Sequence, residues 1–333
     1  MKKVLKGIGI ILIIGIIILT FLGIKYRGQI EFYINTIKNY KTIEVNAKAI
    51  PLSGTKNESM KDSQNIVINE KENNKVILNI YKSEKHLKSG SPVIIYVHGG
   101  AWMYGNSEIP ENMSGVINQF RKAGYTIISV DYTLDTKTID FNLQTTEVKD
   151  AIRWVYKNSE EYNFNTNSIG IIGASAGANL AMLAAYSDND KFVGNESLKD
   201  YSSKVNYVVD LFGPTELSSL SENGESKELL EAVNKKEANL KTKAALKDYM
   251  DTYSPINYIK KGLPKTLIIQ GKDDKIVPYS NSVDLYDKSK EVGNDVNLIL
   301  LNNMGHAFTN INEKQTKEVI YKLLNFILFN SKL

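Results

Sequence analysis

Short apolar runs alternate with helix-forming stretches over more than 200 residues of this chain, and this alternation limits the fold more than any other feature. Continuous apolar runs suit strands buried on both faces of a parallel sheet. Six such strands are expected, at Val93–Val97, Tyr125–Val130, Ile169–Ile172, Tyr207–Phe212, Thr266–Ile269 and Val296–Leu301. Helices are expected at Met113–Lys122, Gln144–Lys157, Ala176–Tyr186, Ser282–Glu291 and Lys314–Phe329. This order predicts an α/β fold with a mostly parallel central sheet and helices on both of its faces.

Composition agrees with a globular chain of this kind. The 333 residues are 42% hydrophobic and 23% charged, which excludes a disordered, collagen-like or low-complexity protein. The chain contains no cysteine, so disulfides, thiolate metal ligands and a cysteine nucleophile are excluded. Two further strands, with alternating polarity, are predicted ahead of the parallel set, at Asn65–Asn69 and Lys75–Tyr81.

The basic charge of the chain is concentrated at its N-terminus. The formal net charge is +4, and five basic residues with no acidic neighbour precede Glu31: Lys2, Lys3, Lys6, Lys25 and Arg27. Residues 28–333 therefore carry a net charge of 4 − 5 = −1. A body with this balance has no nucleic-acid signature in its charge, and no nucleic-acid partner is expected.

An apolar segment near the N-terminus predicts a membrane span. Residues 8–24 contain no charged side chain, and a helix over residues 4–24 would be about 31 Å long, close to the hydrocarbon thickness of a bilayer. The alternatives are a cleaved signal peptide and a buried core helix. Residues 21–27 contain no A-x-A-like cleavage site, and lysines flank the segment on both sides, so a retained signal anchor over residues 1–27 is favoured.

The charge around this segment also predicts its orientation. The positive charges before it outnumber Lys25 and Arg27, so the N-terminus is expected in the cytoplasm, and a single-pass protein of the cell membrane would then expose its body outside the cell. Residues 28–61 are interpreted as a juxtamembrane stalk and residues 62–333 as the globular body. A polar, helix-prone insertion at about 218–250 separates two strands. It is interpreted either as a lid over the active site or as a crossover helix with a long loop.

A candidate nucleophile motif follows the third strand of the parallel set. The pattern G-x-S-x-G is present there as Gly173-Ala174-Ser175-Ala176-Gly177. An apolar strand precedes it and a helix-forming stretch follows, which is the strand–turn–helix setting that exposes a nucleophilic serine on a strained elbow. The start of the helix also directs backbone N–H groups towards the serine oxygen. The alternative is a structural turn of a nucleotide-binding protein. The context favours Ser175 as a nucleophile.

A serine nucleophile needs a base, and the chain contains three histidines. His306 follows the last predicted strand, where parallel sheets place functional groups. His86 lies among lysines and is expected in solvent, whereas His98 precedes two glycines and suggests a backbone role. Asp273 and Asp274 follow another strand, and either could orient the imidazole. The order serine, aspartate, histidine is that of α/β-hydrolases.

A glycine-rich loop, His98-Gly99-Gly100-Ala101-Trp102, directly follows the strand Val93–Val97. Small residues allow backbone N–H groups to approach a reacting oxygen closely, so this loop is a candidate oxyanion hole. The alternative is an ordinary glycine-rich turn, but the loop follows the strand expected beside the one that carries Ser175.

With these motifs, the sequence resembles the α/β-hydrolase superfamily, and within it the hormone-sensitive-lipase-like and carbohydrate-esterase-like carboxylesterases with an H-G-G-G/A-W loop. The resemblance covers residues 62–330. Further matches lie at Asp131-Tyr132, Asp150–Trp154, Gly213–Leu217, Tyr253–Pro255 and Gly271–Pro278. The last match, G-x-x-D-x-x-V-P, identifies Asp274 as the triad acid. Three positions depart from the family pattern: Thr133 replaces an arginine, Glu216 an aspartate and Ala101 a glycine.

The resemblance implies a serine carboxylesterase with the triad Ser175, His306 and Asp274. It also implies an oxyanion hole formed by the N–H of Ala176 and that of Gly100 or Ala101. The substrate would be a small-molecule or glycan ester with a short acyl group such as acetyl, and no metal or organic cofactor is implied. An amidase, peptidase or formamidase with the same triad is one alternative. Others are a non-catalytic binding module and a membrane lipase. The sequence leaves oligomeric state and substrate specificity open.

Overall fold

The computed structural model describes residues 63–71, 74–134, 138–222 and 242–332, together with Arg27 and Ile30. The chain divides into two compact units, Met1–Ile43 with Leu333, and Glu44–Lys332. In the first unit Arg27 and Ile30 are helical and exposed. The predicted membrane segment, residues 4–24, lies outside the described residues, as does the stalk apart from Ile30. No helix within the described ranges has the length and apolar character needed to cross a membrane.

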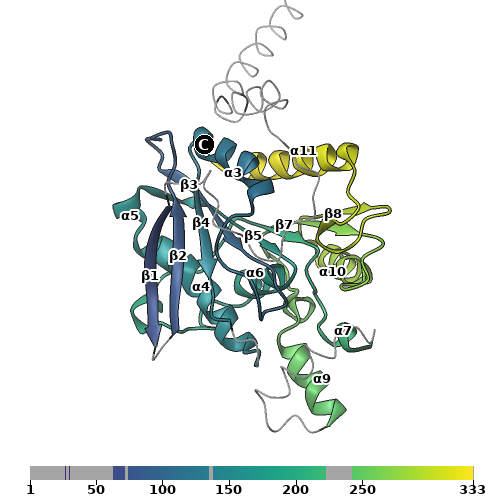
Figure 1. The fold of residues 1–333 in the computed structure, drawn as a ribbon. Helices are drawn as coiled ribbons and strands as arrows, with labels where there is room; N and C mark the ends of the chain where they lie inside the picture. The colour runs from purple at the N-terminus through teal and green to yellow at the C-terminus, as the bar shows by residue number, and fades with distance from the viewer. Residues whose placement is uncertain are drawn as a thin grey trace, which may run out of the picture. The chain divides into compact units, whose positions relative to one another are not determined.

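The described part of the second unit forms one eight-stranded sheet with the order β1-β2-β4-β3-β5-β6-β7-β8 (Figure 1). The strands are β1 Ser63–Lys71, β2 Asn74–Tyr81, β3 Ser91–Val97, β4 Thr126–Asp131, β5 Phe164–Ala174, β6 Tyr207–Leu211, β7 Lys265–Gly271 and β8 Val296–Leu301. The pairs β1–β2 and β2–β4 are antiparallel, and every other neighbouring pair is parallel. The predicted mostly parallel sheet is confirmed.

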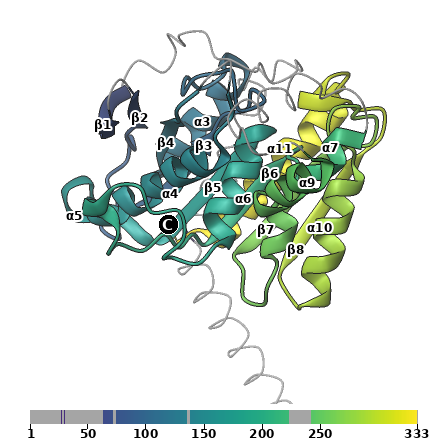
Figure 2. The same cartoon turned by 90° about the horizontal axis from the view of Figure 1, so that it is seen from below.

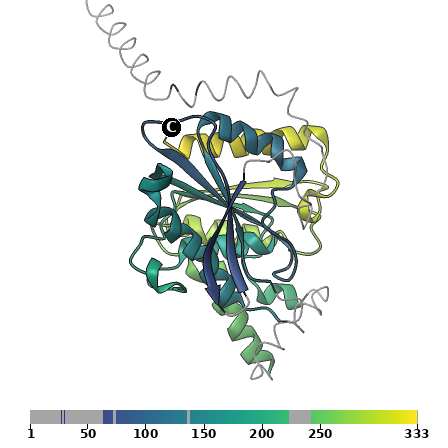
Figure 3. The same cartoon turned by 60° about the vertical axis from the view of Figure 1, so that its left-hand side comes forward.

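Helices cover both faces of this sheet. The longer ones are α3 Glu111–Ala123, α4 Phe141–Lys157, α6 Ala176–Tyr186, α10 Ser280–Glu291 and α11 Glu313–Asn330. Figure 3 shows α3 and α11 side by side over one face, and Figure 2 shows α4, α6 and α10 over the other. Shorter elements are α5 Ser159–Tyr162, α7 Ser218–Glu222, α9 Lys243–Thr252 and the 3₁₀ helices η3 Glu196–Leu198, η4 Pro255–Tyr258 and η5 His306–Phe308.

The central strands are buried on both faces, as their continuous apolar sequences require. Every residue of β3 is buried, and its Val93 and Ile95 lie opposite β4 on one side and β5 on the other. The alanine-rich helix α6 packs closely on these strands, and all of its residues except Ala185 are buried. A tightly packed centre of this kind gives the loops at the carboxyl ends of the strands a rigid base.

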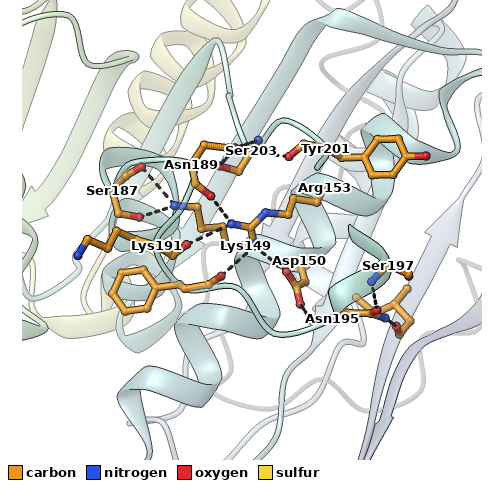
Figure 4. A network of polar contacts seen from close by, with 12 residues as sticks. Lys149, Asp150, Arg153, Ser187, Asn189, Lys191, Asn195, Ser197, Tyr201 and Ser203 are labelled. Carbon is orange, nitrogen blue, oxygen red and sulfur yellow. Dashed lines mark hydrogen bonds and ion pairs between the residues drawn. The ribbon is translucent and has the colours of Figure 1, made fainter. Parts of the chain in front are cut away.

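Two buried cations of α4 hold the segment that follows α6 (Figure 4). The Nζ of Lys149 donates to the hydroxyl of Ser187 at 2.8 Å. The guanidinium of Arg153 pairs with Asp150 at 2.6 Å and donates to three backbone carbonyls, those of Asn189, Lys191 and Phe192. Because each buried charge meets several acceptors, the cluster joins α4 firmly to the chain leaving α6.

The predicted insertion begins with α7 and ends with α9, and residues 223–241 lie outside the described residues. The ring of Tyr249 in α9 lies 6.0 Å from that of Phe141 at the start of α4. Phe141 in turn meets Trp102, the last residue of the glycine-rich loop, edge to face at 5.2 Å. The end of the insertion is therefore linked to that loop by aromatic packing, and its role as a lid stays a prediction.

Candidate active site

Ser175 lies at the turn between β5 and α6. Its backbone has φ 52° and ψ −121°, a left-handed φ that a residue with a side chain adopts only when its surroundings hold it there. Its N–H donates to the carbonyl of Leu211 at 2.9 Å, which ties the turn to the neighbouring strand β6. The strand–turn–helix context predicted for Ser175 is therefore present, and the residue is 7% exposed.

Three sequence-predicted residues meet at the carboxyl edge of the sheet. The Oγ of Ser175 lies 2.9 Å from Nε2 of His306, and Nδ1 of His306 lies 2.7 Å from Oδ2 of Asp274. They come from the ends of β5, β8 and β7. A carboxylate only accepts, so Nδ1 of His306 carries the proton and Nε2 can accept the hydroxyl proton of Ser175. This arrangement can activate the serine oxygen as a nucleophile.

Asp274 is buried and receives four hydrogen bonds. Its Oδ1 accepts from the backbone N–H groups of Ile276 and Val277, both at 2.9 Å. Its Oδ2 accepts from His306 and from Nε2 of Gln270 at 2.9 Å. The four donors together fix the position and orientation of the carboxylate. Asp273, the other aspartate of this loop, is exposed and lies outside this hydrogen-bonded group.

The imidazole of His306 also has an aromatic support. The ring of Phe212, directly after β6, stands edge to face against it with 5.1 Å between ring centroids. Phe308 also packs edge to face against Phe212, with 4.8 Å between ring centroids. The sequence reading missed both Phe212 and Gln270. A signal existed for Gln270, because it is a polar residue within the buried run of β7, whereas Phe212 resembles any other core residue.

The loop His98–Trp102, hereafter the oxyanion loop, lies against the serine turn. A Cβ built on Gly99 would be 3.3 Å from Cβ of Ser175, so the two segments are in direct contact. Gly100 has φ 127°, and a side chain there would meet the carbonyl of Tyr104. Ala176, the third residue predicted to line the oxyanion hole, is the first residue of α6. The residues predicted to supply N–H donors thus come from two touching segments.

His98 supports the backbone of the oxyanion loop. Its Nδ1 donates to the carbonyl of Gly99 at 2.7 Å, and its ring stacks on Tyr132 at 4.3 Å. The hydroxyl of Tyr132 donates to the carbonyl of His98 at 2.9 Å. Burial lowers the pKa of His98 to about 4, so the ring is neutral at ordinary pH. The backbone role expected for His98 agrees with these contacts, and His86 is exposed as expected.

Backbone strain is concentrated around this site. Ten described residues other than glycine have positive φ, and eight of them lie in the segments that follow β3, β5, β6 and β8: Ala101, Trp102, Ser175, Phe212, Asn303, Ala307, Phe308 and Asn310. Left-handed residues with side chains cost roughly 1–2 kcal/mol each. Such strain persists where packing fixes the geometry, and it commonly accompanies functional sites.

One departure from the family pattern has a visible consequence. The N–H and hydroxyl of Thr133 both donate to the carboxylate of Glu147 at 2.7 Å. Burial raises the pKa of Glu147 to about 7, and no arginine stands at position 133 to oppose this.

Within the described ranges, no group of three or more His, Asp or Glu side chains is arranged to hold a metal ion.

Sequence comparison finds relatives among esterases. A protein-family model described as BD-FAE matches residues 78–289. Esterase LipC of Mycobacterium tuberculosis is 24% identical over 254 residues, covering 75% of this chain and 61% of LipC. The carboxylic ester hydrolase LipM of the same organism is 23% identical over 206 residues, with 62% of this chain and 46% of LipM covered. The chain thus spans less than two thirds of the length of these relatives.

Solved structures with the same fold include esterases. A truncated form of a carbohydrate esterase from gut microbiota has a TM-score of 0.62 at 24% identity, and the match covers 83% of this chain and 100% of the esterase chain. A propionate-bound esterase 2 of Thermogutta terrifontis has a TM-score of 0.64 at 22% identity, covering 80% and 95% of the two chains. These likenesses establish the α/β-hydrolase fold.

Proposed function

The chain belongs to the BD-FAE family of α/β hydrolases, and we propose that it is a serine carboxylesterase acting on short acyl esters. The observation that carries the proposal is the hydrogen-bonded series Ser175–His306–Asp274 beside the oxyanion loop. These groups are what acyl transfer requires: a nucleophile, a base, an acid that orients the base, and backbone donors.

In the proposed first step, Oγ of Ser175 attacks the ester carbonyl carbon while Nε2 of His306 takes the hydroxyl proton. The electron pair of the carbonyl moves to its oxygen, which accepts from the N–H of Ala176 and from that of Gly100 or Ala101. Each such donor stabilises the transition state by about 2.7–4 kcal/mol. The bond to the alcohol oxygen then breaks, and the protonated His306 returns the proton to the leaving alkoxide.

In the second step, a water molecule attacks the acyl-enzyme. His306 takes a proton from the water, a second oxyanion forms at the same donors, and the bond to Ser175 breaks as the proton passes to its Oγ. The carboxylate of Asp274 stabilises the imidazolium in both steps and keeps Nδ1 protonated. The products are a carboxylic acid and an alcohol, and the enzyme returns to its starting state.

The substrate class is proposed from two neighbours in structure. One was solved as a carbohydrate esterase and the other with propionate, a three-carbon acid. We infer a short acyl group, with acetyl esters on glycans or small alcohols as candidates. The polar character of the insertion, residues 218–250, supports the same inference, because long acyl chains need an extended apolar surface.

Hydrolysis of p-nitrophenyl esters from acetate to decanoate by the full chain in detergent tests this function. Ser175→Ala serves as the matched control. We expect turnover that is fastest with the shortest acyl groups and lost in the variant. Equal turnover by both proteins would exclude Ser175 as the nucleophile. Turnover of anilides but of no ester would instead support an amidase, and turnover of neither would support a binding module.

We further propose that residues 4–24 anchor the chain in the cell membrane with the catalytic body outside. The support is the uncharged apolar stretch of residues 8–24 and the excess of lysine before that stretch. In cells that express the full chain, we expect the protein to stay in the membrane fraction after carbonate washing. Protease added to intact cells should digest the body. Release of the protein by carbonate would contradict the membrane anchor. Protection of the body from protease would contradict the proposed orientation.

A further inference from the structure

Gln144 joins two loops at the edge of the proposed active site. It lies on α4 and is only 2% exposed. Its Nε2 donates to the carbonyl of Trp102, in the oxyanion loop, and to that of Thr133, in the loop after β4, both at 2.8 Å. One side-chain amide therefore uses both of its protons to bridge two backbone segments that are separated by about 30 residues of chain.

The oxyanion loop needs such a restraint because its backbone is strained. Ala101 and Trp102 are consecutive left-handed residues, with φ 52° and 61°. A pair of this kind relaxes unless neighbouring groups hold the intervening peptide units. The hydrogen bond from Gln144 fixes the carbonyl of Trp102, two residues beyond the N–H of Gly100. The ring of Trp102 is held as well, against Phe141 in the first turn of the same helix.

Packing alone does not account for a glutamine at this position. Its Oε1 is buried and, within the described part of the chain, has no hydrogen-bond partner. An unpaired buried acceptor destabilises a fold, so an apolar side chain of similar size would fill the space more favourably. What the amide adds is its two directed N–H groups, and both of them restrain loops.

We propose that Gln144 is a positioning residue for the oxyanion hole. By holding the carbonyl of Trp102, it keeps the N–H groups of Gly100 and Ala101 aimed at the place where the oxyanion forms. The inference rests on the proposed function. It predicts that loss of the amide lowers kcat and leaves KM nearly unchanged, because the oxyanion exists only in the transition state and intermediate.

Gln144→Met is the first test, because it keeps the length of the side chain and removes both donors. In the full chain, with p-nitrophenyl acetate, we expect kcat to fall about tenfold to a hundredfold, with KM within about twofold of wild type. The loss should be smaller than that from removing an oxyanion donor itself, about 10²–10³-fold. Backbone hydrogen exchange across residues 98–104 should become faster at the same time.

Gln144→Glu is the second test, and it serves if the methionine variant does not fold. An ionised carboxylate repels both carbonyls, whereas a protonated one can donate to one of them. The deficit in kcat relative to wild type should therefore narrow as the pH is lowered. A loss of folding would also reverse with pH, but the melting temperature would then rise in step with kcat, so both are measured at each pH.

Asn294→Leu is the matched control. This amide also bridges backbone segments, donating to the carbonyl of Lys260 at 2.9 Å and accepting from Gly262, but it lies at the opposite edge of the sheet, before β7 and β8. We expect it to lower the melting temperature and to leave kcat and loop exchange as in wild type.

Three outcomes for Gln144→Met would overturn the inference. They are an unchanged kcat, unchanged hydrogen exchange in residues 98–104, and a fall in kcat/KM that comes entirely from a rise in KM. If the wild-type chain hydrolyses no ester, the proposed function fails separately. The exchange rates of the loop then decide whether Gln144 positions it.

Discussion

The amide Nε2 of Gln270 lies 2.9 Å from Oδ2 of Asp274, the same oxygen that accepts the Nδ1 proton of His306. Gln270 is fully buried in β7, and a second hydrogen bond, to the carbonyl of Val277, fixes the orientation of its amide. The carboxylate is therefore held from the strand below it as well as by the backbone of its own loop. Part of the catalytic geometry is thus built into the sheet.

Replacing Gln270 by leucine removes this donor and keeps the volume nearly constant. Hydrogen bonds to charged groups contribute about 1.5–3 kcal/mol, so we expect kcat/KM to fall roughly tenfold or more. Turnover of p-nitrophenyl acetate by wild type and variant at one pH measures this loss. A kcat/KM equal to that of wild type would show that Gln270 has no role in orienting Asp274.

Gly177 has no room for a side chain. A Cβ there would lie 2.3 Å from the carbonyl oxygens of both Val97 and His98, which are backbone atoms of the central strand and the oxyanion loop. We expect Gly177→Ala to lose activity by more than a hundredfold or to fail to fold, as urea unfolding and p-nitrophenyl acetate turnover would show. Gly293→Ala is the control. Its Cβ meets nothing within 4 Å, so only its φ of 82° costs stability, about 1 kcal/mol.

Asp210 predicts a pH-dependent stability. It is fully buried in β6, and burial raises its pKa from 3.8 to about 7. Between these values the folded chain binds one more proton than the unfolded chain, so the free energy of unfolding falls as the pH rises from 4 to 7.

Asp210→Asn removes that titration, and its carbonyl can still accept from the N–H of Gly213 as Asp210 Oδ1 does at 2.8 Å. From pH 5 to pH 8, wild type should lose roughly 2–3 kcal/mol relative to the variant. Urea unfolding of both proteins at each pH measures this, and other titrating groups cancel in the comparison. Parallel stability curves would refute the assignment.

The buried cluster of α4 in Figure 4 predicts a large loss of stability on truncation. Arg153→Met leaves Asp150 and three carbonyls without their shared donor, and breaking a buried ion pair costs about 3–5 kcal/mol. Lys199→Met, which removes an exposed pair with Glu196, should change the free energy of unfolding by less than about 1 kcal/mol. Similar effects of the two substitutions in urea would show that the buried cluster contributes little.

The sequence pattern predicts most of the fold because local periodicity reports which faces are buried. The expected ranges Val296–Leu301 and Ala176–Tyr186 coincide with β8 and α6. The main discrepancy is β5, predicted over Ile169–Ile172 and observed over Phe164–Ala174. Its first half is polar, with Asn165 and Asn167, and it extends as a strand because it pairs with β3 through an irregular register.

The sequence by itself determined the candidate nucleophile, the histidine of the last loop and the glycine-rich loop, because each depends on a local turn that only certain residues can form. The family resemblance already selected Asp274 over Asp273, and only the tertiary structure decided which side chains hold the site in place. Phe212 and Gln144 resemble ordinary residues along the chain, and Gln270 differs only as a polar residue within a buried run. Their contacts with the site span from 4 residues, between Gln270 and Asp274, to 306 − 212 = 94, between Phe212 and His306. Those distances follow from strand register and helix packing, and no local pattern encodes them.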